Sequence, residues 1–286
     1  MSSIFELAGQ LYEDPVFRER SAALPANTPL DYRELATILV EYWRQRNCEL
    51  IGLGGGQGAG KSTLASLLQA AAAVVGERLV VLSIDDFYLT RQERQQLAAT
   101  KQALFATRGP PGTHAIERLR QVVEELRDGC SVTIPKFDKG LDDRVGSIII
   151  EGECDRVLVE GWCVGAVAQP NEQLKQPIND LERVEDTDGA WRRCVNEYLA
   201  GEYAQLTHQF QSLVFLRVPN MVSVRQWRLQ QELNVAQEIR RDAQWVARFV
   251  QYYQRVTEWM WEDVEPRADV CVKLDERHRI QALRLS

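Results

Sequence analysis

The sequence lacks the paired cysteines of a disulfide scaffold or a zinc site. Its 286 residues include six cysteines, and no two of them stand within four positions of each other, which excludes a CxxC motif. Scattered thiols of this kind are typical of a reducing compartment, where they serve as small core residues. We therefore expect a cytoplasmic protein.

Membrane-directing segments are also missing. The first fifteen residues have neither a basic region nor an apolar core, so we expect no signal peptide. The most apolar stretch, 64–76, is short and interrupted by Ser66 and Gln69, so it cannot span a bilayer. These features predict a soluble protein with no membrane partner.

An excess of positive charge is absent too. The chain carries 34 basic and 41 acidic residues, which gives a formal net charge of −7. A protein that bound nucleic acid through its overall field would have the opposite balance, so we expect no nucleic-acid partner. An acidic surface also repels ATP, and any phosphate site must therefore be a local concentration of basic groups.

What the sequence does contain is a series of short apolar runs separated by helical patterns. Five runs are expected to form buried strands: 49–53, 79–84, 157–159, 213–218 and 270–274. Helical patterns lie between them, for example over 116–126. This alternation predicts an α/β layered fold with a mostly parallel sheet.

The chain divides into a helical N-terminal extension, 1–47, and a main domain, 48–286. Thr28 is predicted to cap a helix that has Pro29 at its first position. Within the main domain we expect a helical insertion over 170–211. Residues 220–264 are predicted to form one long helix or two in series, with 220–240 acting as a lid.

The stretch GGQGAGKST at 55–63 fits the P-loop pattern G-x-x-x-x-G-K-[ST] and lies between an apolar strand and a helix. Its backbone N–H groups and the helix N-terminus would hold the phosphates of ATP. Lys61 would bridge the β- and γ-phosphates, and Ser62 would bind Mg²⁺. A glycine-rich turn without a ligand is the alternative. The predicted nucleotide-binding residues are Gly55, Gly56, Gln57, Gly58, Ala59, Gly60, Lys61, Ser62 and Thr63.

Carboxylates follow two of the predicted strands, where ligands gather in parallel sheets. Asp85 and Asp86 end the second strand, and one of them could accept a proton from an attacking hydroxyl. Glu160 ends the third strand and could hold Mg²⁺, with Asp86 as a further metal candidate. A solvated acidic turn and a buried structural carboxylate are the respective alternatives.

Basic residues concentrate in two loops that are rich in proline and glycine. The loops are RGPPGTH at 108–114 and PKFDK at 135–139 followed by DDR at 142–144. Such loops suit an anionic acceptor, because arginine binds carboxylates in bidentate fashion. The predicted acceptor-binding residues are Asp85, Tyr88, Arg108, His114, Lys136, Lys139 and Arg144. We do not expect His114 to bind a metal, since no cysteine or second histidine is near it in sequence.

Two arginines follow the fourth predicted strand. Arg225 and Arg228 are three positions apart and therefore share a helix face. They could close over the γ-phosphate and neutralise charge in the transition state, or they could simply be exposed. The later stripe of Trp245, Phe249, Tyr252, Val256 and Met260 is expected to pack in the core.

Taken in order, these motifs resemble the P-loop kinases of the phosphoribulokinase, uridine kinase and pantothenate kinase group. The stretches LSIDDFYLT, RGPPGTH, IPKFDKGLDDR, VLVEGWCVG, LERVEDTDGAWRRCVNEYL and VRQWRLQQE resemble the plant-type D-glycerate 3-kinase family and its bacterial and fungal relatives most closely. The resemblance covers roughly 49–235. One position departs from the family pattern, because Ala115 stands where the RGxPGTH stretch continues into an aspartate.

The resemblance implies a P-loop NTPase sandwich that phosphorylates D-glycerate to 3-phosphoglycerate with ATP and Mg²⁺. It implies that Asp85 is the general base. We expect Lys61, Arg225 and Arg228 to assist transfer. Two alternatives remain: a kinase of another small hydroxylated acceptor, such as a nucleoside or a pantothenate-like acid, and a nucleotide-binding regulatory protein with little catalysis. The sequence leaves the oligomeric state open.

Overall fold

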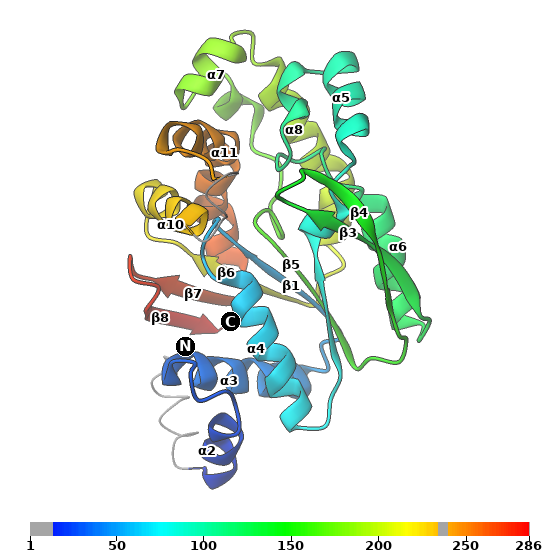
Figure 1. Cartoon of the computed structure of the whole chain (residues 1–286). Helices are drawn as coiled ribbons and strands as arrows, with labels where there is room; N and C mark the ends of the chain where they lie inside the picture. Colours follow the sequence, from blue (N-terminus) through cyan, green and yellow to red (C-terminus); the bar gives the residue numbers. More distant parts are fainter. Residues whose placement is uncertain (1–13, 234–239, 286) are drawn as a thin grey trace.

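The computed structural model describes residues 14–233 and 240–285. A six-stranded sheet with strand order β2-β5-β1-β6-β7-β8 lies at its centre (Figure 1). The five predicted strands are all present and parallel: β1 (Leu50–Gly55), β2 (Leu79–Ser83), β5 (Arg156–Gly161), β6 (Ser212–Arg217) and β7 (Val270–Leu274). The edge strand β8 (Ile280–Leu285) runs antiparallel to β7 and falls outside the predicted set.

The sheet is buried on both faces, which explains why its strands are uninterrupted apolar runs. On β5, Val157 and Val159 pack into the hydrophobic cluster on one face of the sheet, whereas Leu158 packs into the cluster on the other. All three side chains have no exposed surface. A strand covered by helices on each side has no polar face, so it loses the alternation of a half-exposed strand.

Helices form a layer on each face of the sheet (Figure 1). Helices α3 (Leu30–Arg46), α4 (Lys61–Val74) and α10 (Met221–Leu233) pack into one cluster, and α6 (Ile116–Arg127), α8 (Ala190–Tyr198) and α9 (Ala204–Thr207) pack into the other. The long helix α11 (Ala243–Arg267) contributes to both. The architecture is the predicted three-layer α/β sandwich. The remaining helices and turns are α2 (Pro15–Ala22), η1 (Ile84–Phe87), α5 (Arg91–Thr100), η2 (Ala103–Ala106), η3 (Asn171–Leu174), α7 (Asp180–Glu185) and the π-helical turn η4 (Leu199–Tyr203).

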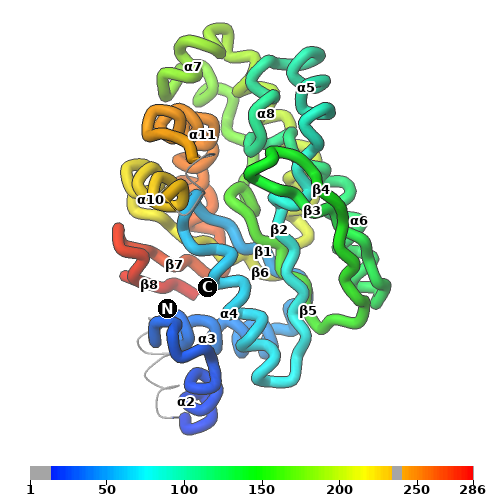
Figure 2. Tube along the Cα trace, viewed as in Figure 1, coloured from blue at the N-terminus to red at the C-terminus, as the bar shows by residue number. Residues whose placement is uncertain are grey.

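A separate two-stranded hairpin, β3 (Val132–Asp138) and β4 (Asp143–Ile150), lies beside α6 (Figures 1 and 2). It corrects the prediction that 135–144 consists of loops. Val132, Ile134 and Phe137 are buried, while the residues between them are half-buried or exposed, as in a strand that covers a core with one face. Pro135 is tolerated because this strand lies outside the main sheet and only one other strand pairs with it.

The N-terminal helices pack directly on the main sheet. Leu35, Leu39 and Trp43 of α3 belong to the same cluster as β1, and the Trp43 indole donates to Ser212 Oγ at 3.1 Å. Helix α3 begins one position later than predicted: its N-cap is Pro29 rather than Thr28, and no side chain caps it. The division of the chain at residue 47 stays a prediction, and 1–13 lie outside the described residues.

The predicted insertion over 170–211 contains η3, α7, α8, η4 and α9. The alternative of two helices in series holds for 220–264, because α10 and α11 are distinct. Part of the predicted lid, 234–239, lies outside the described residues. The predicted core stripe of α11 is confirmed: Phe249, Tyr252, Val256 and Met260 are buried, and Trp245 packs against the same clusters.

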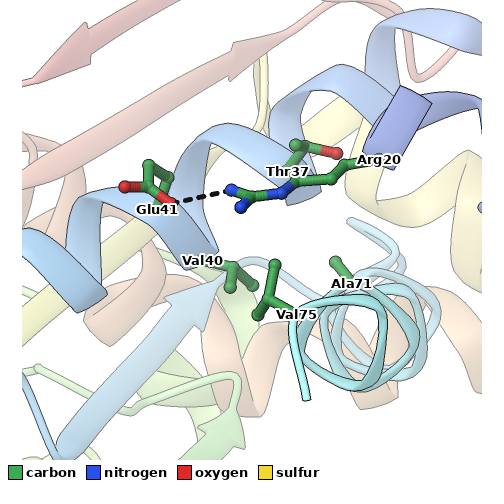
Figure 3. A pocket seen from close by; sticks show the side chains of 6 residues that line it. All are labelled: Arg20, Thr37, Val40, Glu41, Ala71 and Val75. Atoms are coloured by element: carbon green, nitrogen blue, oxygen red, sulfur yellow. Dashed lines mark hydrogen bonds and ion pairs between the residues drawn. The ribbon is translucent and has the colours of Figure 1, made fainter. Parts of the chain in front are cut away.

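A small cavity lies between α2, α3 and α4 (Figure 3). Arg20 reaches across it to Glu41 at 3.1 Å, and Val40 and Val75 line it from α3 and from the residue after α4. Its volume of about 10 Å³ is roughly the space of one water molecule. The cavity lies at the opposite end of α4 from Lys61, so we assign it no ligand. No helix in the described part of the chain is long and apolar enough to cross a membrane.

Candidate active site

The carboxyl ends of β1, β2 and β5 bring the predicted site segments together. In the sheet register, Glu160 of β5 lies between Leu53 of β1 and Ser83 of β2. The P-loop follows β1 directly, and Asp85 stands two residues after Ser83. Phosphate-binding backbone and acidic side chains therefore converge at one edge of the sheet, as the parallel strand order requires.

The P-loop connects β1 to α4, which begins at Lys61 as predicted. The Lys61 ammonium folds back onto the loop and donates to the carbonyl oxygens of Gly55 (2.8 Å) and Gly56 (2.9 Å). Burial lowers the Lys61 pKa, while the charges of Glu160 and Asp85 oppose that change. A cation held at the N-terminus of a helix, next to amides that have no intrahelical partner, fits a bound polyphosphate.

Ser62 and Glu160 form a contact that suits a divalent cation. Ser62 Oγ donates to Glu160 Oε1 at 2.9 Å, although 98 residues separate them in sequence. Mg²⁺ in kinases is commonly held by one or two protein oxygens, with phosphate and water oxygens completing the octahedron. Within 14–233 and 240–285, no group of three or more His, Cys, Asp or Glu side chains could hold a metal by itself. The Ser62–Glu160 pair therefore fits Mg²⁺ bound together with a nucleotide.

Asp85 lies in η1 and pairs with Lys139, whose Nζ is 2.7 Å from Asp85 Oδ2. The other oxygen, Oδ1, is buried and has no hydrogen-bond partner among the described residues. Burial would raise the Asp85 pKa, but the Lys139 ammonium, with a smaller effect of the Tyr88 hydroxyl, lowers it to about 2. At neutral pH Asp85 is thus an ionised carboxylate with one unpartnered oxygen.

The neighbouring Asp86 faces the hairpin instead. Its Oδ1 accepts a long hydrogen bond, 3.4 Å, from the backbone N–H of Phe137, and burial raises its pKa. No described contact joins Asp86 to Ser62 or Glu160. Its role as a metal ligand stays a prediction.

The RGPPGTH loop packs closely against aromatic side chains, which accounts for its two glycines. Gly109 has φ +120° and Gly112 has φ +102°, and a Cβ at either would overlap the ring of Tyr253 or Tyr198, respectively. The loop is joined to the segment after η1 by an isolated bridge between Tyr88 and His114. These two rings also stack, with centroids 4.4 Å apart. Because the Tyr88 backbone N–H contacts the Asp85 carbonyl oxygen, Asp85, Tyr88 and His114 pack together.

Arg108 is not an unpaired acceptor-binding cation in this arrangement. Asp142 accepts from Arg108 and, at 2.7 Å, from Arg94. The Arg94 side chain is fully buried. Arg144 is also engaged, because its Nε donates to the Tyr88 carbonyl oxygen at 2.8 Å. The basic residues thus hold the hairpin against the segment that follows β2.

The other predicted cations lie further from these contacts. Lys136 is exposed on β3, and Arg225 is exposed on α10. Arg228 forms an ion pair with the buried Glu232 one turn along α10, although its charge also reaches Tyr253 beside the RGPPGTH loop. The roles predicted for these three residues in acceptor binding and lid closure stay predictions.

Four further residues of the site carry no recognisable sequence signal. Arg94 lies in a polar helix pattern, and Asp142 is the first of two aspartates in a turn. Tyr203, on η4, lies 2.6 Å from His114 Nδ1, and Tyr253 donates to the Arg108 carbonyl oxygen at 3.0 Å. Each contact spans more than 30 residues, so only the folded chain reveals it.

A strand, glycine loop and helix, with Glu160 at the end of the adjacent strand β5 and Asp85 just after β2, the next strand along, are the features of a P-loop kinase. No family model matches the chain. Over 197 residues it is 34% identical to the uncharacterized kinase mug58 of Schizosaccharomyces pombe, a match that covers 64% of this chain and 69% of that protein. Over 202 residues it is 27% identical to the chloroplastic D-glycerate 3-kinase of Arabidopsis thaliana, covering 66% of this chain and 42% of that longer protein.

Solved structures agree with this class. The D-glycerate 3-kinase from Cryptococcus neoformans var. grubii superposes with a TM-score of 0.75 at 26% identity, covering 90% of this chain and 99% of that one. The chain belongs to the family of P-loop kinases that includes the fission-yeast protein and has D-glycerate 3-kinases among its relatives. It is a kinase, and these relatives imply ATP-dependent phosphoryl transfer to a small molecule.

Proposed function

We propose that the acceptor is a small hydroxy acid, D-glycerate, and that the product is 3-phosphoglycerate. The observation that supports this most directly is the Lys139–Asp85 pair, which places a cation beside the carboxylate that would take the hydroxyl proton. A carboxylate-bearing acceptor could exchange for Asp85 as the partner of Lys139. The D-glycerate 3-kinases among the relatives support the same acceptor.

In this proposal Asp85 accepts the proton of the acceptor hydroxyl as its oxygen attacks the γ-phosphorus. The bond between that phosphorus and the β–γ bridging oxygen breaks, and ADP leaves. The transition state of phosphoryl transfer is loose, so a positioned carboxylate serves even though its pKa is low. Lys61 would neutralise charge on the transferring group. Mg²⁺, held by Ser62 and Glu160, would supply charge compensation for the phosphate oxygens.

Two alternatives have specific consequences. A kinase of a neutral nucleoside would not need the Lys139 cation beside its base. A nucleotide-binding regulator would not need Asp85, whose buried Oδ1 has no partner among the described residues. The cation and the unpartnered oxygen both favour catalysis on an anionic acceptor, and the measurement below distinguishes the three.

The test is ADP release from ATP in the presence of single acceptors: D-glycerate, L-glycerate, glycerol, uridine and pantothenate. We expect stimulation by D-glycerate, with little by glycerol, which has the hydroxyls but no carboxylate. Phosphorus NMR of the product would assign the phosphorylated oxygen. Asp85→Asn, prepared identically, controls for contaminating kinases. Stimulation by uridine or pantothenate alone would identify a different acceptor, and stimulation by none would favour the regulator.

A further inference from the structure

His114 is buried on the proposed acceptor side of the site, next to Asp85 and Tyr88. Its side chain is 2% exposed, it stacks on Tyr88, and its Nδ1 lies 2.6 Å from the Tyr203 hydroxyl oxygen. The hydroxyl oxygen also accepts from the backbone N–H of Gly112 at 3.1 Å. These contacts determine which atom carries the proton in each group.

The Tyr203 hydroxyl has one proton to donate, and Tyr203 itself is 2% exposed. If Nδ1 carried the imidazole proton, the tyrosine would accept from both Gly112 and His114, and its own proton would be buried without an acceptor. That arrangement leaves a donor unsatisfied, which costs about 1–3 kcal/mol. The hydroxyl therefore donates to Nδ1, and Nδ1 is unprotonated.

The His114 imidazole is neutral at neutral pH. Burial lowers the His114 pKa to about 4, although the negative charge of Asp85 acts in the opposite direction. A neutral imidazole has one N–H, so its proton resides on Nε2. His114 then presents a donor at Nε2 and cannot act as a base there.

Nε2 is buried and has no hydrogen-bond partner in the described part of the chain. Asp85 Oδ1 is also buried without a partner in that part of the chain. Asp85 adjoins His114 through Tyr88, whose backbone N–H donates to the Asp85 carbonyl oxygen at 3.4 Å and whose ring stacks on His114. An unpaired donor and an unpaired acceptor at one site match a hydroxyl-bearing ligand, since a hydroxyl can donate to one group and accept from the other.

We propose that Tyr203 is a positioning residue that fixes His114 in its Nε2–H tautomer, so that His114 donates to an oxygen of the acceptor substrate. Asp85 accepts that substrate's hydroxyl proton on the adjacent side. The inference rests on the proposed kinase reaction for the ligand, but the tautomer itself does not depend on which acceptor is used.

The π-helical turn η4 supplies the geometry. Tyr203 is its last residue, and Gly201 within it departs from helical angles with φ −93° and ψ −109°. The chain is kinked at Gly201, and a kink changes the direction of the side chains that follow it. Here the turn brings the tyrosine to a histidine that is 89 residues away in sequence.

The first experiment is nitrogen-15 NMR of the whole chain with its three histidines labelled. His114→Gln assigns the His114 resonances by their disappearance. We expect the Nε2–H tautomer with no titration between about pH 5.5 and 8, because the pKa is near 4. A protonated Nδ1, or a doubly protonated ring at pH 7, would overturn the inference.

The second experiment tests the consequence with Tyr203→Phe. Loss of one neutral hydrogen bond predicts a roughly tenfold rise in the acceptor KM, with the ATP KM unchanged and a mixed or altered His114 tautomer. Tyr252→Phe is the matched control, since it removes the hydroxyl of another buried tyrosine, which accepts from Arg248 at 3.2 Å. Retention of both the wild-type tautomer and the wild-type acceptor KM in folded Tyr203→Phe would contradict the proposal.

A comparison of two His114 variants distinguishes a hydrogen-bond donor role from a purely structural one. The amide of His114→Gln can place a donor near the Nε2 position, so it should retain more activity than His114→Leu. Equal losses in the two variants would contradict the donor role. If Tyr203→Phe does not fold, or if no tested acceptor is phosphorylated, the wild-type tautomer decides the inference independently of the proposed function.

Discussion

The phosphate half and the acceptor half of the site are built in different ways. The phosphate half is one continuous segment, 55–63, supplemented by Glu160 from the neighbouring strand. The acceptor half joins side chains from η1, the loop before α6, the β3–β4 hairpin, η4 and α11. Its functional groups come from several segments that polar contacts join, while those of the P-loop half come from one loop and one neighbouring strand.

This difference predicts different responses to mutation. Changes in the phosphate half should affect nucleotide binding and leave the fold intact. Changes in the acceptor half should couple activity to stability, because its polar residues also join separate elements. The substitutions below test this contrast in order of decreasing effect.

The largest effect is expected for Asp85→Asn. Removing a general base costs about 100- to 10,000-fold in rate, which should appear in kcat with the acceptor that the protein uses. Affinity for ATP, measured by calorimetry, should remain near that of the wild type because Asp85 is not part of the P-loop. Wild-type kcat in this variant would show that Asp85 is not the base.

Lys61→Met should reduce the activity that depends on the phosphate half of the site. Loss of one charged stabiliser of the transferring group predicts a decrease of about 100- to 1,000-fold in kcat/KM. The urea midpoint of unfolding should change little, because the hydrogen bonds that the described residues give the Lys61 ammonium go to carbonyls of its own loop. A large loss of stability would remove the contrast between the two halves.

Asp142→Ala should reduce stability as well as activity. It leaves the buried Arg94 guanidinium without its carboxylate, and breaking such a pair costs roughly 2–4 kcal/mol in the free energy of unfolding. Urea denaturation followed by circular dichroism would measure it. The exposed pair of Lys175 and Glu172 offers the control: Glu172→Ala should cost less than about 0.5 kcal/mol.

Glu202, next to Tyr203, makes stability depend on pH. Burial, with the charge of Glu117, raises its pKa to about 7, so the folded state holds this proton more tightly than the unfolded chain. Wild-type stability should therefore fall as pH rises from about 4.5 to 7. Glu202→Gln should be more stable than the wild type at pH 8, by roughly 1–2 kcal/mol after discounting for partial exposure. Near pH 4 the two should be alike, and an equal difference at both pH values would contradict this assignment.

The smallest effect concerns Ala115, which is the N-cap of α6 and makes no side-chain cap hydrogen bond. Ala115→Asp should add an acceptor for the first helical N–H groups and stabilise the fold by about 0.5–1 kcal/mol. Thermal unfolding of this variant beside Ala115→Gly would measure it. An aspartate no more stabilising than glycine would show that this position does not accept a capping side chain.

The same contrast explains how much could be predicted from the sequence. The P-loop, Asp85 and Glu160 were accessible because each is defined by its place after an apolar strand. The sequence does not predict the hairpin, since Pro135 and the charged residues on either side of Phe137, Lys136 and Asp138, obscure a strand whose partner is largely exposed. Asp142 and Tyr203 could not be assigned, because one adopts φ +56° in a turn and the other depends on a π turn.

The hairpin also bears on how this kind of kinase can change its acceptor. Lys139 lies just after β3, in a connection between strands that share no hydrogen bonds with the central sheet. Insertions or substitutions there alter the cation beside Asp85 without altering any strand that supports the P-loop. Under the proposed role of Lys139, acceptor choice could therefore change through the hairpin while the central sheet keeps the P-loop in place.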